Sequence, residues 1–260
     1  MKVVLFCGGL GTRLRDHSES VPKPLVQIGT RPIIWNIMKY YAHFGYKDFI
    51  LCLGYRGAAI KEYFLNYNEC ISNDFVLRDG GTDLELMSSD IQDWTITFVD
   101  TGLGSNIGQR LLRVKEHLKS EPYFLANYTD GLSDVRMDLM VDKLTQSGKT
   151  AMFVGVRPNA TFHIIESGVS GSVRSIKKIS SGDYRANGGF FVFKNDIFDY
   201  INEGEELIEE PFHRLIAKDQ LLTHLHDGFW ACMDTVSEFN YLQEIEAQGN
   251  APWHVWNNSH

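Results

Sequence analysis

Short apolar runs alternate with amphipathic segments through the first half of this 260-residue chain, and few folds accommodate that order. The apolar runs are predicted to be buried strands, and the segments between them place apolar residues at helical spacing. The predicted strands span residues 3–7, 48–55, 95–102 and 123–131, and the predicted helices span residues 33–44, 58–67 and 107–118. This rhythm is typical of a doubly wound, mostly parallel, Rossmann-like α/β sheet.

The ends of the predicted strands carry glycines and polar residues. In doubly wound sheets, ligands bind beyond the carboxyl ends of the strands. Residues 8–11, 100–102 and 129–131 all follow predicted strands, so we expect them to converge on one edge of the sheet. These three segments are the first candidates for a site.

The second half of the chain is richer in short β segments, at residues 151–156, 162–167, 172–179 and 188–193. We expect this β-rich extension to enlarge the first sheet and to form a pocket beside it. Residues 68–94 are an irregular insertion, for which a β-hairpin arm is one interpretation. No internal repeat or low-complexity linker divides the sequence, so residues 1–260 are predicted to form a single domain.

The composition argues against several classes of protein. The chain has 33 acidic and 25 basic residues and a formal net charge of −8, which is unlike a general nucleic-acid-binding protein. No apolar run approaches the roughly 18 residues that a membrane span needs. A strand and a glycine turn occupy the first positions, so no signal peptide is expected. The four cysteines are scattered without metal-like spacing, and a reduced, cytoplasmic protein is expected.

A glycine-rich turn follows the first predicted strand. Gly8, Gly9 and Gly11 are followed at once by Thr12 and Arg13. Backbone N–H groups in such a turn can cradle phosphate oxygens, and an arginine adds a planar fork of donors. A tight turn without a ligand is the plainer interpretation of the glycines alone. The spacing is not GxGxxG and no acidic residue follows at the ribose-binding position, which disfavours a dehydrogenase.

Lys23 adds a second cation to this region. It stands between Pro22 and Pro24, which restrict the backbone on both sides and reduce the entropy lost in aiming the side chain. A cation 4 Å from a phosphate charge contributes about 4 kcal/mol at an effective dielectric constant of about 20. Together with Arg13, Lys23 could hold a triphosphate in spite of the negative net charge.

Two aspartates far apart in the sequence complete the candidate site. Asp130 and Asp234 each follow an apolar run and precede Gly or Thr, so each is predicted to point from a strand tip into the cleft. Either one alone could simply cap a turn. Mg²⁺ prefers one or two carboxylates with phosphates and waters, so the pair beside a glycine turn favours a magnesium site.

Longer motifs resemble one family of enzymes. GGLGTRL followed by PKP is similar to the signature of sugar-1-phosphate nucleotidyltransferases. Further stretches resemble the glucose-1-phosphate cytidylyltransferase-like branch of this family, namely RPIIWNIMKYYAHFGYKDFILCLGY, IKEYFLNY, WTITFVDTG, NGGFFVF and GFWACMDT. The resemblance, which runs from residue 1 to about residue 256, implies that a sugar-1-phosphate oxygen attacks the α-phosphorus of a nucleoside triphosphate and releases pyrophosphate. Such a transfer needs in-line positioning and charge neutralisation rather than a covalent nucleophile.

The resemblance also implies roles for individual residues. Residues 1–131 would bind the nucleotide and residues 132–260 the sugar. Asp130 and Asp234 would bind Mg²⁺, and Asn187 and Gly188 would line the sugar pocket. Gly8, Gly9 and Gly11 would contact the base and phosphates of the nucleotide. Arg13 would contact the pyrophosphate and Lys23 the α-phosphate. Thr12 and Arg110 would be further nucleotide contacts.

Three features depart from the family's pattern, and all lie on the sugar side. Thr129 stands where a glycine usually precedes the metal-binding aspartate. The usual Glu-Lys-Pro before Asn-Gly-Gly is missing, and only Lys177 or Lys178 could replace its lysine. His163 stands where related enzymes have a small residue. Position alone adds further candidates for the sugar pocket, namely Tyr184, Arg185 and Glu210.

These departures leave three functions open. The first is synthesis of a nucleotide-sugar, with Lys178 on the sugar phosphate. The second is rearrangement of a bound nucleotide-sugar, for example between pyranose and furanose rings, with His163 as the acid–base group. The third is a non-catalytic sensor, against which the retention of Asp130 and Asp234 speaks. The resemblance to oligomeric enzymes implies a homo-oligomer in which residues 68–94 pack on a neighbouring subunit.

Overall fold

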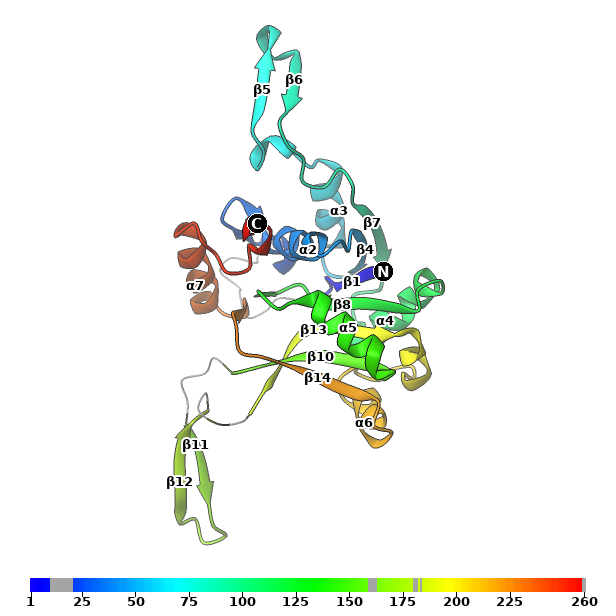
Figure 1. Ribbon diagram of the computed structural model, residues 1–260, viewed down its shortest axis with the longest axis vertical. Helices are drawn as coiled ribbons and strands as arrows, with labels where there is room; N and C mark the ends of the chain where they lie inside the picture. The colour runs from blue at the N-terminus through cyan, green and yellow to red at the C-terminus, as the bar shows by residue number, and fades with distance from the viewer. Residues whose placement is uncertain (10–20, 159–162, 180–181, 183, 259–260) are drawn as a thin grey trace.

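A sheet of seven strands forms the centre of the part of the molecule that the structure describes (Figure 1). The structure is a computed structural model that describes residues 1–9, 21–158, 163–179, 182 and 184–258. The strands are β1 (Lys2–Phe6), β4 (Asp48–Leu53), β7 (Thr95–Asp100), β8 (Tyr123–Tyr128), β10 (Ala151–Val156), β13 (Ala186–Lys194) and β14 (Leu221–His226). Their order across the sheet is β14-β10-β13-β8-β1-β4-β7.

The pairing within this sheet is mostly parallel. β13 runs antiparallel to β8 and β10, whereas the pairs β10–β14, β8–β1, β1–β4 and β4–β7 are parallel. The central strands β1, β4 and β8 are buried on both faces, which explains their continuous apolar sequences. Helices cover both faces as well, so the prediction of a doubly wound, mostly parallel α/β sheet is confirmed.

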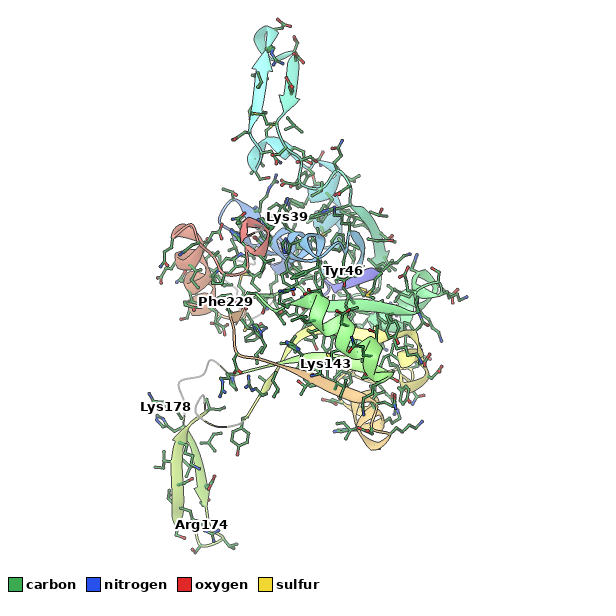
Figure 2. All side chains as sticks on the ribbon, in the orientation of Figure 1. Lys39, Tyr46, Lys143, Arg174, Lys178 and Phe229 are labelled. Carbon is green, nitrogen blue, oxygen red and sulfur yellow. The ribbon has the colours of Figure 1, made fainter. Side chains whose placement is uncertain are left out.

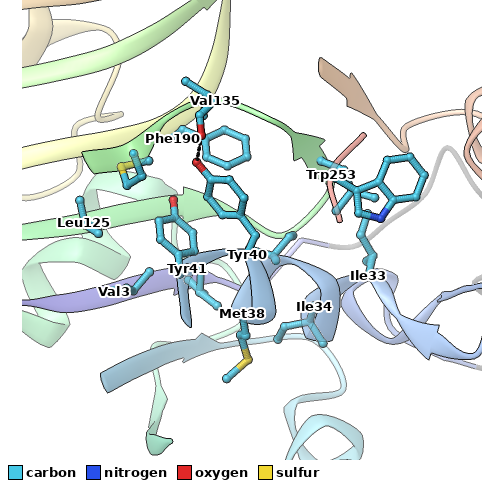
Figure 3. Packing of buried hydrophobic residues seen from close by; sticks show 14 of the residues in the cluster. Val3, Ile33, Ile34, Met38, Tyr40, Tyr41, Leu125, Val135, Phe190 and Trp253 are labelled. Atoms are coloured by element: carbon cyan, nitrogen blue, oxygen red, sulfur yellow. Dashed lines mark hydrogen bonds between the residues drawn. The ribbon is translucent and has the colours of Figure 1, made fainter. Parts of the chain in front are cut away.

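The helices divide into two layers. They are α2 (Ile33–His43), α3 (Gly57–Leu65), α4 (Ile107–Val114), α5 (Met137–Ser147), α6 (Glu210–Ala217) and α7 (Val236–Ala247). Side chains of α2, α3, α5 and α7 join one core, and side chains of α4 and α6 join the other. In the first core, Tyr40 and Tyr41 pack against Phe190, and the Tyr40 hydroxyl donates to the Val135 carbonyl at 2.6 Å (Figure 3). No helix in the described part of the chain is both long and apolar enough to cross a membrane.

The predicted strands and helices of the first half all end somewhat earlier than their apolar patterns suggest, and the helix over 107–118 and the strand over 123–131 are shortened most. α4 ends at Val114, and a 3-10 turn continues it from Lys115 to Leu118. β8 ends at Tyr128, where the Thr129 hydroxyl donates to the Phe6 carbonyl at 3.0 Å. The next strand, β9 (Gly131–Ser133), then leaves the sheet and pairs with β15 (Trp230–Cys232) in a two-stranded antiparallel ribbon.

Several short elements complete the chain. The strands β2 (Gln27–Ile28) and β3 (Arg31–Pro32) pair with each other. The 3-10 helices are η2 (Lys23–Leu25), η3 (Glu69–Ile71), η4 (Asp79–Gly81), η5 (Lys115–Leu118), η7 (Asn195–Tyr200) and η8 (Val255–Asn258).

Two β-hairpins project from the body as separate arms (Figure 1). β5 (Phe75–Arg78) pairs with β6 (Asp83–Leu86), so the insertion does contain a hairpin arm. β11 (His163–Ser167) pairs with β12 (Val173–Lys178). This second arm corrects the expectation that the β segments of the second half all enlarge the sheet. β10, β13 and β14 do so, but β11 and β12 are mostly exposed and pair only with each other.

Candidate active site

Lys23 lies between two carboxylates that come from distant parts of the chain. Its Nζ donates to Asp130 Oδ2 at 2.8 Å and to Asp234 Oδ1 at 2.6 Å. The two acids therefore lie close enough to share one cation. The Lys23 side chain is 15% exposed, whereas the acids are 32% and 39% exposed, so the carboxylates are more accessible to solvent than the lysine between them.

The charge of Lys23 is stabilised by this arrangement. Burial by itself lowers the pKa of the ammonium group, but Asp130 and Asp234 outweigh burial and hold the pKa above its ordinary value. The lysine begins η2, directly after Pro22 in an extended conformation, and the Leu25 N–H donates to the Pro22 carbonyl at 2.8 Å. A tight turn anchored by proline thus aims the side chain.

The β9–β15 ribbon brings the two acids together. Asp130 directly precedes β9, and Asp234 lies two residues after the end of β15. Gly131 pairs with Cys232, and the Met233 N–H donates to the Asp130 carbonyl at 2.7 Å. The ribbon is therefore the element that makes one site from two segments a hundred residues apart.

Glu238 fixes the backbone of Asp234. Its Oε2 accepts from the N–H groups of Asp234 and Thr235, both at 2.9 Å, within a capping box that begins α7. The Cys232 thiol donates to Glu238 Oε1 at 3.4 Å. Burial, with the charges of Glu238 and Asp234, raises the pKa of this thiol to about 12, so Cys232 stays protonated at neutral pH.

Replacing Glu238 tests this support. Glu238→Ala is expected to lower the free energy of unfolding by about 1 kcal/mol, the usual loss for a helix N-cap interaction. It should also weaken the binding of an added divalent cation such as Mn²⁺ at the two acids, because the Asp234 N–H loses its acceptor. Glu238→Gln keeps an acceptor of the same shape and should keep most of both properties. Urea unfolding measures the free energy of unfolding, and metal titration measures the affinity for the cation. If Glu238→Ala and Glu238→Gln lowered both quantities equally, the hydrogen-bonding role of Glu238 would be contradicted.

A cavity of about 290 Å³ opens beside the two acids. Its lining residues come from the ends of β8, β13 and the ribbon, and they are Asn127, Tyr128, Asp130, Gly131, Asn187, Gly188, Trp230, Cys232 and Asp234. The Trp230 indole N–H donates to the Gly188 carbonyl at 2.8 Å. A Cβ on Gly188 would lie 2.8 Å from Val156 Cγ1, so only glycine fits this wall without movement. The structure thus places Asn187 and Gly188 beside the acids.

Arg110 lies beneath the glycine turn. Its guanidinium donates to the Gly8 carbonyl at 2.5 Å, to the Thr101 hydroxyl at 2.7 Å and to the Leu53 carbonyl at 3.2 Å. The residue is 2% exposed, and burial lowers its pKa. Its donors are directed at the protein backbone and Thr101, so Arg110 supports the turn, and a direct contact with a nucleotide stays a prediction. Gly9, by contrast, is exposed.

The other predicted site residues are not among those that line this cavity, or they lie outside the described residues. Gly11, Thr12 and Arg13 belong to the latter group. Thr129 is buried, with its hydroxyl on the Phe6 carbonyl. Glu210 is exposed in the first turn of α6.

The candidates on the second arm do not line the cavity either. His163 and Lys178 face each other across β11 and β12, and both are exposed. Figure 2 shows Lys178 at the base of this arm. Tyr184 joins Lys177 and Lys178 around a separate cavity of about 460 Å³. Arg185 is held by the His226 carbonyl at 2.8 Å and by Asp227 at 2.9 Å.

Some residues of the site were missed by reasoning from the sequence. Glu238 had a readable signal, since Thr235 and Glu238 form the T-x-x-E pattern of a capping box. Asn127 had a weaker signal, a polar residue within an apolar strand. It is 1% exposed, and its side-chain oxygen accepts from the Phe190 N–H at 3.1 Å.

The fold and the site define a doubly wound α/β protein with a cavity, lined by two acids, beside the carboxyl ends of β1 and β8. Comparison with known proteins places it more narrowly. Residues 2–246 match the nucleotidyl transferase family, and the chain belongs to that family.

Individual relatives agree with this assignment. The chain is 39% identical to the glucose-1-phosphate cytidylyltransferase of Salmonella typhi, over 98% of this chain and 100% of the relative. It is 36% identical to a probable glucose-1-phosphate cytidylyltransferase of Bacillus subtilis, with the same coverage. Among solved structures, a putative glucose-1-phosphate thymidylyltransferase from Bacillus anthracis superposes with a TM-score of 0.68 at 15% identity, covering 94% of each chain, which supports the fold.

Proposed function

We propose that this protein transfers a nucleotidyl group from a nucleoside triphosphate to a sugar 1-phosphate and releases pyrophosphate. The observation that carries the proposal is the cation-bridged pair of acids, Lys23 between Asp130 and Asp234, together with the cavity that both acids line. In the reaction, a phosphate oxygen of the sugar forms a bond to the α-phosphorus. The bond from that phosphorus to the oxygen bridging to the β-phosphorus breaks, and pyrophosphate leaves with the electron pair.

The donor set at the acids fits Mg²⁺. Mg²⁺ is usually bound by one or two carboxylates, with substrate phosphates and water in the remaining positions. Asp130 and Asp234 supply two carboxylates, and no group of three or more His, Cys, Asp or Glu side chains gathers anywhere in the described residues to suggest another metal site. When bound, the ion would neutralise charge on the triphosphate. Lys23 would add positive charge on the α-phosphate, where negative charge accumulates during transfer.

The names of the relatives guide the choice of first substrates. CTP with glucose 1-phosphate is the first pair to test, because relatives that are 36% and 39% identical over their entire length are named for it. GTP, dTTP, ATP and UTP, with mannose 1-phosphate and galactose 1-phosphate, complete the panel. The assay measures pyrophosphate with and without Mg²⁺ in the purified full chain. Metal-dependent release that needs both substrates supports the proposal, and no release from any pair contradicts it.

The same samples test the two alternatives. Finished nucleotide-sugars are incubated with the protein and followed by NMR for isomerised product, and binding is measured by calorimetry. The site favours neither alternative, because His163 lies on the second arm and is not among the residues that line the cavity. Isomerisation without pyrophosphate chemistry would support rearrangement, and tight binding without any turnover would support a sensor.

The first arm supports the expectation of a homo-oligomer. Phe75 pairs with Leu86, and Leu77 with Leu84, so these apolar side chains share one face of the hairpin. Leu77 is 55% exposed and Leu84 47% exposed. An isolated two-stranded hairpin is marginally stable in water. We infer that a second copy of this chain covers the apolar face.

The arm is also held firmly enough to present that face. At its base, the Tyr67 hydroxyl and the Lys39 ammonium donate to the buried Asp90 at 2.9 and 3.2 Å. The Arg31 guanidinium donates to the Asn68 carbonyl at 2.8 Å. This network ties the arm to α2 and β3, so the hairpin has an anchored origin.

Charging the apolar face is expected to dissociate the oligomer. Leu84→Lys places an ammonium group on the covered face and should shift the mass measured by light scattering after gel filtration toward the monomer. Val76→Lys is the matched control, since Val76 points to the opposite face, where it pairs with Glu85. The wild-type mass should be kept in this control. A monomeric wild type, or equal dissociation in both variants, would contradict the proposed interface.

A further inference from the structure

The β9–β15 ribbon that holds the two acids is short. Three residue pairs form it, from Gly131 opposite Cys232 to Ser133 opposite Trp230, and it does not join the seven-stranded sheet. Two-stranded ribbons of this size are marginal by themselves. A slip of one residue would also turn every side chain to the other face. Something outside the ladder must therefore hold its register.

Four residues close the end of the ribbon opposite the acids. Asp134 Oδ1 accepts from the Phe229 N–H at 2.8 Å and lies 2.9 Å from His226 Nε2. The same ring nitrogen lies 3.1 Å from the Phe229 carbonyl, to which the Ser133 hydroxyl donates at 2.7 Å. We call Ser133, Asp134, His226 and Phe229 the clasp.

The clasp connects the ribbon to the main sheet. His226 is the last residue of β14 and pairs with Val156 of β10. The turn that follows is closely packed, since a Cβ on Gly228 would lie 2.6 Å from Asp134 Oδ1 and 2.7 Å from His226 Cε1. Burial lowers the pKa of His226, but its hydrogen bonds with Asp134 and the Phe229 carbonyl raise the pKa above the ordinary value. Nε2 carries a single hydrogen, which lies between the Asp134 carboxylate and the Phe229 carbonyl and can be shared by both acceptors.

We propose that Asp134 and His226 are positioning residues that lock the register of the ribbon and thereby set the spacing of Asp130 and Asp234. The acids leave one end of a rigid two-stranded element, and the clasp fixes the other end to the sheet. Neither of these two side chains is among the residues that line the cavity beside the acids. This inference rests on the proposed function only in assigning the acids to a metal.

Hydrogen exchange of the full chain tests the structural half of the proposal without any substrate. His226→Ala should speed amide exchange in peptides that cover residues 129–134 and 229–234. His226→Gln keeps a donor near the position of Nε2 and should restore most of the protection. His224→Ala is the matched control, because His224 lies on the same strand, is half-buried, and is not part of the clasp. Equal exchange in wild type and His226→Ala would overturn the inference.

Metal titration of the pyrophosphate assay tests the other half. In His226→Ala, we expect the Mg²⁺ concentration for half-maximal activity to rise several-fold, with kcat at saturating Mg²⁺ within about twofold of wild type. Asp134→Asn, which removes only the charge, should give a smaller shift in the same direction and serves if the alanine variant does not fold. Faster exchange with an unchanged metal requirement would overturn the positioning role. If the wild-type protein released no pyrophosphate, the proposed function would be refuted instead. The comparison of hydrogen exchange in wild type and His226→Ala would still test whether the clasp holds the ribbon.

Discussion

Replacing Lys23 with methionine is expected to abolish most pyrophosphate release and, at the same time, to tighten the binding of a divalent metal. Methionine keeps the length of the side chain and removes its charge. Loss of a preorganised donor to developing charge typically lowers kcat by about 10²- to 10³-fold. The opposite effect on metal binding follows from the structure, because the Lys23 ammonium already lies between Asp130 and Asp234 and competes for the same oxygens.

The size of the second effect follows from Coulomb's law. Two charges 4 Å apart interact by about 4 kcal/mol at an effective dielectric constant of about 20. The carboxylates of the site are about one-third exposed, so solvent reduces this value. A tightening of roughly tenfold, or ~1.4 kcal/mol, is therefore expected. Titration with Mn²⁺, followed by its EPR signal, measures it without turnover.

A surface lysine provides the control. Lys119→Met removes an exposed lysine that pairs with Glu116. This variant should change neither the rate of pyrophosphate release nor the affinity for Mn²⁺. Full turnover in Lys23→Met would show that the lysine does not act on the transferred phosphate. Weaker Mn²⁺ binding in that variant would show that Lys23 helps to hold the acids together rather than competing for them.

The sequence predicted those parts of the site that depend on local order along the chain. Apolar strands buried on both faces have a plain signature, and the carboxyl ends of parallel strands meet at one edge, which is enough to bring Gly8 and Asp130 together. The sequence also predicted that Asp130 and Asp234 would lie in one site, but it did not indicate which structural element would bring them together. The element that brings them together, the β9–β15 ribbon, was not predicted, because the strand predicted over residues 123–131 runs past the end of β8 at Tyr128 and into the start of β9 at Gly131.

The sugar side of the site was harder to predict, because a sequence that predicts a β-strand does not show which other strand it pairs with. Residues 162–167 and 172–179 were predicted as short β segments, and nothing in their sequences tells whether they join the sheet or pair with each other. The structure gives the second answer, so His163 and Lys178 lie on an arm. Arg110 illustrates the same limit. Its helix was predicted, but its contact with Gly8, about a hundred residues earlier, depends on packing that no local pattern records.

The contact between Gly8 and Arg110 leads to a large expected effect of a single methyl group. In Gly8→Ala, the new Cβ would fall within the guanidinium of Arg110, which is buried and donates to the Gly8, Thr101 and Leu53 groups. The arginine must move, and its hydrogen bonds would be broken or lengthened. We expect the free energy of unfolding to fall by about 2–3 kcal/mol, as for overpacked cores.

Gly9 is the matched control for this substitution. Among the described residues, and apart from its neighbours in the chain, no atom lies within 4 Å of a Cβ built on Gly9, so Gly9→Ala should change stability by no more than about 0.5 kcal/mol. Its effect should fall instead on the affinity for the triphosphate, because a methyl group would hinder close approach of the backbone to phosphate. Urea unfolding and nucleotide titration of the two variants separate these effects.

A double-mutant cycle identifies the cause of the stability loss. Arg110→Met removes the guanidinium that the new methyl group would meet, so Gly8→Ala should cost less in that background than in wild type. Contacting residues usually show coupling energies of about 0.5–3 kcal/mol, and a value in this range is expected here. Additive losses would mean that Gly8 is constrained by something other than Arg110, and the guanidinium would then not be what shapes the glycine turn.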